Sequence, residues 1–154
     1  MIAKDIVSKK IITVREDMSI KELADLFVKK KIGGAPVVNS QGDLVGIVTE
    51  GDLVSQDARI HFPTYIHLLD GFIYLPSSVA RYEREFKKHL GLIVKDVMTT
   101  DVVTAREDAS IEDIATLMVD KNISRIPILN KEGKLVDLVT KHDIVQALSR
   151  GEAV

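Results

Sequence analysis

The chain contains the same segment twice, and this duplication restricts its fold more than any other feature of the sequence. When the sequence is shifted by 91 residues, residues 3–54 align with residues 94–145 without a gap, and 22 of the 52 aligned positions are identical. A segment of this size buries too little surface to be stable alone. We therefore expect the two repeats to pack on each other about a pseudo-two-fold axis.

Within each repeat the residue pattern predicts a strand, a helix, two strands and a second helix, which gives an α/β (α+β) fold. In repeat 1, residues 11–14 are a short run of β-branched residues. Apolar residues at helical spacing follow and predict a helix over residues 19–31. Residues 35–38 and 44–48 predict two strands joined by a turn at 40–43. The second of these strands is apolar throughout, which is typical of a strand buried on both faces.

The expected helix ends also have recognisable signals. A Ser followed three residues later by an acidic residue has the spacing of a capping box, and this pattern begins the first helix of both repeats: Ser19/Glu22 and Ser110/Asp113. Gly33 and Gly34 favour a C-terminal cap for the helix of repeat 1. The second helix of that repeat is expected to begin at Thr49.

Two longer strings resemble a known family. In repeat 1 they are Ile32-Gly33-Gly34-Ala35-Pro36-Val37-Val38 and, after Gly42, Leu44-Val45-Gly46-Ile47-Val48-Thr49-Glu50-Gly51-Asp52-Leu53. Residues 123–129 and 135–144 repeat this pattern, and residues 94–99 look like the family's usual opening segment. The order and spacing closely resemble the CBS domain, named after cystathionine β-synthase. The resemblance covers roughly two thirds of the chain.

This resemblance implies a tandem pair of CBS domains, also called a Bateman module. Such a pair forms one disc-like α/β unit with up to two clefts for adenosyl ligands between the repeats, and it frequently dimerises. We divide the chain accordingly into repeat 1 (residues 1–54), an ordered connector (residues 55–92) and repeat 2 (residues 93–154).

The overall composition argues against several other classes of protein. The 21 basic and 23 acidic residues leave a formal charge of −2, so nucleic acid is a disfavoured partner. No cysteine is present, which fits a reducing compartment. Residues 1–10 lack the continuous apolar stretch of a signal peptide, and no apolar run is long enough to span a membrane. We expect a cytoplasmic protein.

A Thr-x-x-Asp motif occurs in both repeats where the last strand leads into a helix: Thr49/Asp52 and Thr140/Asp143. Two interpretations fit this spacing. The first is helix capping, in which Thr and Asp satisfy the backbone N–H groups of the first turn. The second is ligand binding, because a helix N-terminus attracts phosphate and a carboxylate accepts both hydroxyls of a ribose. The family resemblance implies the second role for both sites, with Asp on the ribose, and the two roles are compatible.

The repeats differ at positions that carry charge. Gly33-Gly34 of repeat 1 corresponds to Ser124-Arg125, and Glu50-Gly51 corresponds to Lys141-His142. These side chains are either ordinary solvated groups or part of a phosphate site, since a guanidinium binds phosphate well. The resemblance implies the phosphate role for Arg125, in either cleft. Glu50 disfavours a polyphosphate beside the first motif, so we expect the two sites to differ.

Adenine needs an apolar slot with backbone groups at its edge, and the resemblance places these in two regions. One is the start of each repeat, with Ile12, Thr13 and Val14 in repeat 1 and Val103, Thr104 and Ala105 in repeat 2. The other surrounds the Pro that occurs at the same position of both repeats, with Gly34, Ala35, Ile126 and Pro127. Each of these residues is also compatible with an ordinary position in the hydrophobic core or at the edge of a strand.

The sequence contains no recognisable motif for catalysis or metal binding. His61 and His67 are six residues apart, a spacing that matches neither adjacent helical turns nor a zinc site. The sequence has no Gly-rich phosphate loop, no nucleophile elbow and no cysteine nucleophile. We expect no enzyme activity, no metal and no required cofactor.

The connector has its own aromatic and helical character. Residues 61–76 hold four of the seven Phe and Tyr residues of the chain. Residues 81–91 predict an amphipathic helix with Tyr82, Phe86 and Leu90 on one face. This segment either packs on its own module or forms a dimer surface. We favour a homodimer through residues 60–90 and the CBS surfaces, over a peripheral membrane contact.

Two functions are compatible with the sequence. One is a regulatory module that binds AMP, ADP, ATP or an S-adenosylmethionine-like effector and signals to an unknown protein target. The other is an interaction scaffold that keeps the fold without a ligand. The sequence does not fix the number of phosphates on the ligand.

Overall fold

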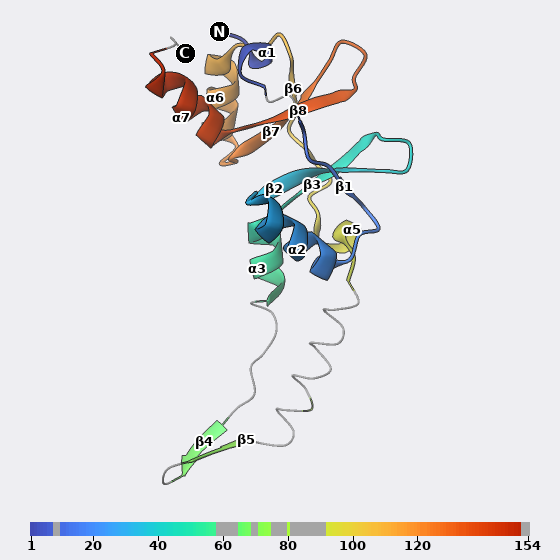
Figure 1. Cartoon of the computed structure of the whole chain (residues 1–154), viewed down its shortest axis with the longest axis vertical. Helices are drawn as coiled ribbons and strands as arrows, with labels where there is room; N and C mark the ends of the chain where they lie inside the picture. Colours follow the sequence, from blue (N-terminus) through green and yellow to red (C-terminus); the bar gives the residue numbers. More distant parts are fainter. Residues whose placement is uncertain (8–9, 58–64, 69–70, 75–79, 81–91, 152–154) are drawn as a thin grey trace.

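The structure is a computed structural model that describes residues 1–7, 10–57, 65–68, 71–74, 80 and 92–151. Each repeat has the predicted order of strand, helix, strand, strand and helix (Figure 1). Repeat 1 consists of β1 (Val14–Arg15), α2 (Ile20–Lys30), β2 (Gly34–Val38), β3 (Leu44–Thr49) and α3 (Glu50–Asp57). Repeat 2 consists of β6 (Ala105–Arg106), α6 (Ile111–Asp120), β7 (Arg125–Leu129), β8 (Leu135–Thr140) and α7 (Lys141–Ser149). The predicted mixed fold is confirmed.

Each repeat forms a three-stranded sheet of the same topology. The strand orders are β1-β2-β3 and β6-β7-β8, with the first pair parallel and the second antiparallel. Even an irregularity in register recurs, between Val37 and Val38 in one sheet and between Ile128 and Leu129 in the other. Sequence identity between the repeats is therefore matched by identity of backbone pairing.

The turns between the paired strands also correspond. Gly42 has φ 81° and Gly133 has φ 76°, the left-handed region that glycine adopts without strain. Asn39 Oδ1 accepts hydrogen bonds from the backbone N–H groups of Gln41 and Asp43, at 3.0 and 2.9 Å. Asn130 makes the same two contacts in the other turn. The predicted turn at 40–43 is confirmed.

Some expected boundaries are wrong. The first helix ends at Lys30, and its C-cap is Lys31 in a left-handed conformation with φ 53°, so Gly33 and Gly34 do not cap it. Gly34 instead begins β2. The first strand starts only at Val14, where the chain pairs with Val37 of β2.

We expected the strand over residues 44–48 to be buried on both faces, and this prediction is wrong. Gly46 and Val48 are buried, but Leu44, Val45 and Ile47 are only half-buried. The reason is that Ile47 points toward a cleft between the repeats and not into a second protein layer.

The capping signals are largely confirmed. Ser19 and Glu22 form the reciprocal capping box, and the hydrogen bond from the Ser19 backbone N–H lowers the pKa of the exposed Glu22 carboxyl. In repeat 2, Ser110 Oγ accepts from the Asp113 N–H at 3.0 Å, which is one half of that arrangement.

The opening segment of each repeat packs on the other repeat. Two short helices mark these segments, α1 (Ala3–Ile6) and α5 (Val94–Val97). The Ala3 N–H donates to Ala109 O at 2.9 Å, and the Val94 N–H donates to Met18 O at 2.8 Å. These two bonds, and the bridges Ile2–Ser110 and Ser19–Ile93, are related by the 91-residue shift. The exchange therefore establishes the expected pseudo-two-fold relation.

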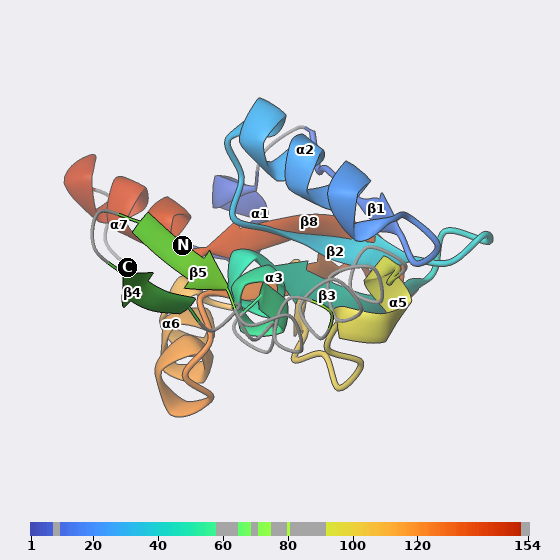
Figure 2. The ribbon, with the colours of Figure 1, turned by 90° about the horizontal axis from the view of Figure 1, so that it is seen from below.

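The figures show the same exchange. In Figure 1, α1 lies with α6 and α7, while α5 lies with α2 and α3. Figure 2 shows α5 beside β3, which it contacts.

Two separate hydrophobic cores result from this arrangement. Ala3 is fully buried in the core of repeat 2, and Val94 is fully buried in the core of repeat 1. Most of the remaining fully buried large side chains belong to one of the two cores, with Leu23, Val14, Val37 and Val48 in the first and Ile111, Ile114, Met118, Ile126, Ile128 and Val139 in the second. Each core thus includes an apolar residue supplied by the other repeat.

Part of the connector is an antiparallel hairpin. Strands β4 (Tyr65–Leu68) and β5 (Gly71–Tyr74) pair with Tyr65 opposite Tyr74 and Leu68 opposite Gly71. The helix predicted over residues 81–91 lies outside the described residues. No helix in the described part of the chain has the length and apolar character needed to cross a bilayer.

We predict that Ala3→Asp destabilises repeat 2, although residue 3 belongs to repeat 1 in the chain. Burying a carboxylate without a partner should lower the free energy of unfolding by at least about 2 kcal/mol. Hydrogen exchange should show lost protection in α6 before α2. The exposed neighbour Lys4 supplies the control Lys4→Ala, which should change neither. Equal loss in both helices would contradict the exchange of segments.

Candidate functional site

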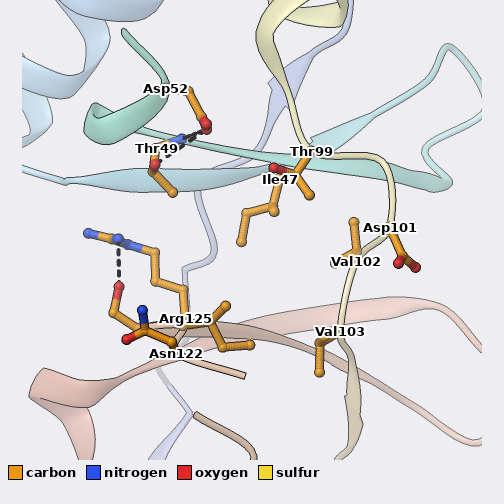
Figure 3. A pocket seen from close by; sticks show the side chains of 11 residues that line it. Ile47, Thr49, Asp52, Thr99, Asp101, Val102, Val103, Asn122 and Arg125 are labelled. Atoms are coloured by element: carbon orange, nitrogen blue, oxygen red, sulfur yellow. Dashed lines mark hydrogen bonds between the residues drawn. The ribbon is translucent and has the colours of Figure 1, made fainter. Parts of the chain in front are cut away.

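A cleft of about 270 Å³ lies between the two repeats. We call it the first cleft; its lining residues are Ile47, Thr49, Asp52, Thr99, Asp101, Val102, Val103, Asn122, Ile123, Ser124 and Arg125 (Figure 3). Strand β3 and the start of α3 form one wall, and the residues before β6 and β7 form the other. Neither repeat alone contains this cleft, so it exists only because the two pack together.

The Thr49/Asp52 motif holds the polar end of the first cleft. Asp52 Oδ2 accepts hydrogen bonds from the Thr49 backbone N–H at 2.8 Å and from Thr49 Oγ1 at 3.3 Å. Both side chains are half-buried and face the cleft (Figure 3). The half of the predicted capping arrangement that Asp52 makes is therefore present, and the same two residues line a cleft.

Thr140 and Asp143 repeat this geometry at the start of α7. Asp143 Oδ2 accepts from the Thr140 backbone N–H at 2.7 Å and from Thr140 Oγ1 at 2.6 Å, and the Asp143 N–H donates back to Oγ1 at 3.3 Å. In both motifs the bonds use Oδ2. Within the described part of the chain no hydrogen bond to the Oδ1 atom of either carboxylate is found, so that oxygen is available to a ligand hydroxyl.

The second cleft is the pseudo-symmetric counterpart of the first and consists of two hollows. One hollow, of about 490 Å³, is lined by Lys31, Ile32, Gly33, Gly34, Ser124, Arg125, Thr140, Lys141 and His142. The other, of about 110 Å³, is lined by Lys10, Ile11, Ile12, Ile32, Gly34, Asp137 and Leu138. Asp143 lines neither hollow directly but is bonded to Thr140, which lines the larger one.

Arg125 lines both clefts. Its side chain is half-buried, and its Nη1 donates to Ser124 Oγ at 3.1 Å (Figure 3). A methyl group added at Gly34 would lie 2.8 Å from both Cδ and Nε of Arg125, and one added at Gly33 would collide with Nη2. The two glycines of repeat 1 therefore provide the space through which this arginine crosses from repeat 2.

The charges of the two clefts are unequal. In the first cleft the ionisable lining residues are Asp52, Asp101 and Arg125. In the second they are mostly basic: Lys10, Lys31, Arg125, Lys141 and His142, with Asp137 as the acidic member. Lys141 lines the second cleft as expected, whereas Glu50 does not line the first cleft, and its carboxylate lies near Gly33. The difference in charge therefore comes from other positions as well.

Several of the residues predicted for the site lie elsewhere. Val14, Ala35, Ile126 and Pro127 are buried, three of them in the two cores. Thr13 is exposed. Thr104 lines a different hollow, between the turns of the two hairpins, where Lys134 Nζ lies 3.7 Å from Asp43 Oδ1. A ligand role for these residues stays a prediction, and for the buried ones it concerns backbone groups.

The apolar residues that line the clefts lie one or two residues earlier in each repeat than those predicted. Val102 and Val103 line the first cleft, and Ile11 and Ile12 line the second. Ile12 and Val103 belonged to the predicted set, whereas Ile11 and Val102 did not. The signal that identifies them is the 91-residue shift, which pairs Ile11 with Val102.

The sequence also failed to predict a second pair of cleft residues. Lys31 and Asn122 occupy equivalent positions, have left-handed φ angles of 53° and 52°, and each lines one cleft. A lysine with this backbone conformation is uncommon and has no clear sequence signature.

Among the described residues, no group of three or more His, Asp or Glu side chains is placed to hold a metal ion. His61 and His89 lie outside the described residues, and no side-chain position is described for His67. His142 lines the second cleft together with Lys141.

Known proteins include close relatives of this chain. It is 38% identical over 154 residues to the uncharacterized protein MJ1426 of Methanocaldococcus jannaschii, covering 96% of this chain and 91% of that protein. It is 32% identical to the inosine-5'-monophosphate dehydrogenase of the same organism, covering 94% of this chain but only 23% of the enzyme. An enzyme can thus contain a segment of this kind within a much longer chain.

A solved structure has the same fold. The CBS domain pair of protein MJ0100, crystallised with 5'-methylthioadenosine and S-adenosyl-L-methionine, superimposes with a TM-score of 0.74 at 27% identity, covering 98% of each chain. The family model of the CBS domain matches residues 3–59 and 94–150, which are the two repeats. The chain therefore belongs to the CBS-domain family, as a tandem pair of CBS domains.

Proposed function

We propose that this chain is a regulatory sensor that binds an adenosine nucleotide, or another adenosyl ligand such as S-adenosylmethionine, between its two CBS domains. The observation that carries the proposal is the first cleft, where a Thr/Asp pair, an arginine and an apolar wall converge from both repeats. A ligand that contacts both walls favours the packed pair and changes the surface presented to a partner.

Each part of an adenosyl ligand has a matching group in the first cleft. The Oδ1 atom of Asp52 is available to accept the ribose hydroxyls. Arg125 and the N-terminus of α3 suit a phosphate. Ile47, Val102 and Ile123 offer apolar contact to the base.

A relative supports this ligand class. The CBS pair of MJ0100 was solved with two adenosyl compounds, one of them S-adenosyl-L-methionine. We infer the same class for this chain, with AMP, ADP and ATP included because of Arg125 and the basic second cleft. The ligand acts as an effector, and no cofactor is required.

We infer a regulatory and not a catalytic role, in the cytoplasm, with a protein target still to be identified. The groups that line the clefts are binding groups, and none of the described residues forms a nucleophile and base pair of a known catalytic type. The proposed division into residues 1–54, 55–92 and 93–154 leaves the connector as a further surface for that target.

We also infer that the protein is a homodimer. Val28 and Val119 occupy equivalent positions on α2 and α6 and are 80% and 74% exposed. Val54 and Val145 are a second equivalent pair, 63% and 61% exposed. Exposed valines at matched positions of both repeats suit a partner that is itself two-fold symmetric, such as a second copy of the chain.

Calorimetry of dialysed protein against adenosine, AMP, ADP, ATP and S-adenosylmethionine tests the proposed function. At least one compound should bind with a micromolar to sub-millimolar Kd. No heat of binding at millimolar concentration for any of them would instead support the ligand-independent scaffold.

We predict that Asp143→Ala weakens adenosyl binding in the second cleft at least about tenfold. The variant lacks the carboxylate and so loses its hydrogen bonds to the ribose, each of which contributes about 1.5–3 kcal/mol to the binding free energy when the acceptor is charged. Asp52→Ala is the matched variant and should affect the first cleft. The residue would have a purely structural role if ligand affinity did not change and the free energy of unfolding fell only by about 1 kcal/mol, the effect of a lost helix cap.

We predict that Arg125→Ala weakens AMP and ATP binding more than adenosine binding, because adenosine has no phosphate to contact the guanidinium. ATP binding in the second cleft should also weaken as salt rises, because Lys141 and its basic neighbours are exposed. The measurement is a titration with the three ligands at two salt concentrations. An equal loss for all three would make Arg125 a structural residue.

We predict that Val28→Glu with Val119→Glu shifts the protein from dimer to monomer in sedimentation experiments, because a charge replaces apolar contact in the interface. Lys131→Glu, in the exposed turn between β7 and β8, should leave the dimer intact. A double Val variant that sediments as the wild type would place the interface elsewhere.

A further inference from the structure

Arg125 is a charged group of the site that has no side chain at its symmetric position. The Thr/Asp motif occurs in both repeats, as do the left-handed positions 31 and 122 and the apolar residues before β1 and β6. The residue equivalent to Arg125 is Gly34. The pair therefore has two clefts but one arginine at this position.

The side chain of Arg125 lies where the two clefts meet. It lines the first cleft with Thr49 and Asp52, and the larger hollow of the second cleft with Thr140. Its Cδ and Nε pass over Gly34, and its Nη2 lies over Gly33, near Glu50 at the start of α3. Gly33 and Gly34 place no side chain between the guanidinium and either cleft.

The two clefts depend on this arginine to different degrees. Arg125 is the one cation among the described residues that line the first cleft, which also contains Asp52 and Asp101. The second cleft has four further cationic or titratable basic groups, Lys10, Lys31, Lys141 and His142. Once its arginine is engaged elsewhere, the first cleft presents only carboxylates as charged groups.

We propose that Arg125 is one phosphate-binding group shared by both clefts, so that a phosphorylated adenosyl ligand in the second cleft makes the first cleft selective for adenosyl ligands without a phosphate. This inference rests on the proposed function. A guanidinium has one unit charge, whereas an AMP-type phosphate carries roughly −1.5 to −2 near neutral pH. One Arg125 cannot neutralise two such groups, so the two phosphate-binding events oppose each other.

The proposal predicts that AMP binds the wild-type chain in two steps of unequal affinity. Asp52→Ala should remove the weaker step, which assigns it to the first cleft. Asp143→Ala should remove the tighter step and should make the remaining AMP step stronger by at least about fivefold, the lower end of measured couplings between sites. Adenosine binding in the first cleft should not change, because adenosine does not compete for Arg125.

The control is the same comparison without the arginine. In an Arg125→Ala background, adding Asp143→Ala should leave AMP affinity in the first cleft unchanged. A gain that persists without Arg125, or no gain in its presence, would overturn the sharing of the arginine. If AMP fails to bind while another adenosyl compound binds, this inference is wrong and the proposed function stands. If none of adenosine, AMP, ADP, ATP and S-adenosylmethionine binds the wild-type chain, the proposed function itself is wrong and this inference fails with it.

A second variant keeps the test independent of the helix cap that Asp143 also forms. If Asp143→Ala does not melt cooperatively, Asp143→Asn takes its place, because it retains an acceptor for the Thr140 N–H.

Gly34→Ala tests the role of Arg125 without a change at Asp143. Its methyl group lies against Cδ and Nε of Arg125 and displaces that side chain. It should weaken AMP in the first cleft at least about fivefold and leave adenosine there unchanged. Unchanged AMP affinity would contradict the proposal.

Discussion

The structure depends on the exchange of opening segments between the two repeats. Each repeat is too small to close its own core, and the missing apolar residue is supplied by the other, Ala3 to repeat 2 and Val94 to repeat 1. The backbone bonds of α1 and α5 fix this relation twice, with the same geometry. Because neither core is complete alone, the sheets are held in one relative position, and the clefts between them are formed in advance of any ligand.

Pseudo-symmetry produces two clefts, and a few substitutions make them different. Backbone register, turn geometry and the Thr/Asp motif are the same in both halves. The charges differ between the halves, because acidic groups accompany the first motif and basic groups surround the second cleft. A duplicated fold thus supplies identical scaffolding, while the side chains at unequal positions allow the two clefts to distinguish ligands. Arg125 connects them because glycine occupies the equivalent position.

The repeat, the order of elements, the turns and the Thr/Asp motif were predictable from the sequence because each has a local signal. The boundary at Lys31 was not, since a left-handed lysine has no such signal and the adjacent glycines suggested a different cap. Ile11 and Val102, which line the clefts, were not predicted, because β1 begins only where Val14 meets Val37, a contact between distant segments. The exchange of segments was also not predictable locally, because Ala3 has the same sequence environment whichever core it enters.

The central claim is that an adenosyl ligand binds between the repeats and contacts both of them. The most direct test is a titration of isotope-labelled protein with AMP, followed by the shifts of backbone amide resonances. The account predicts saturable shifts for Gly51 and His142, at the starts of α3 and α7, and for Ile123 and Ile11, on the opposite walls of the two clefts. Absence of shifts, or shifts confined to the exposed helix faces around Val28 and Val119, would contradict it.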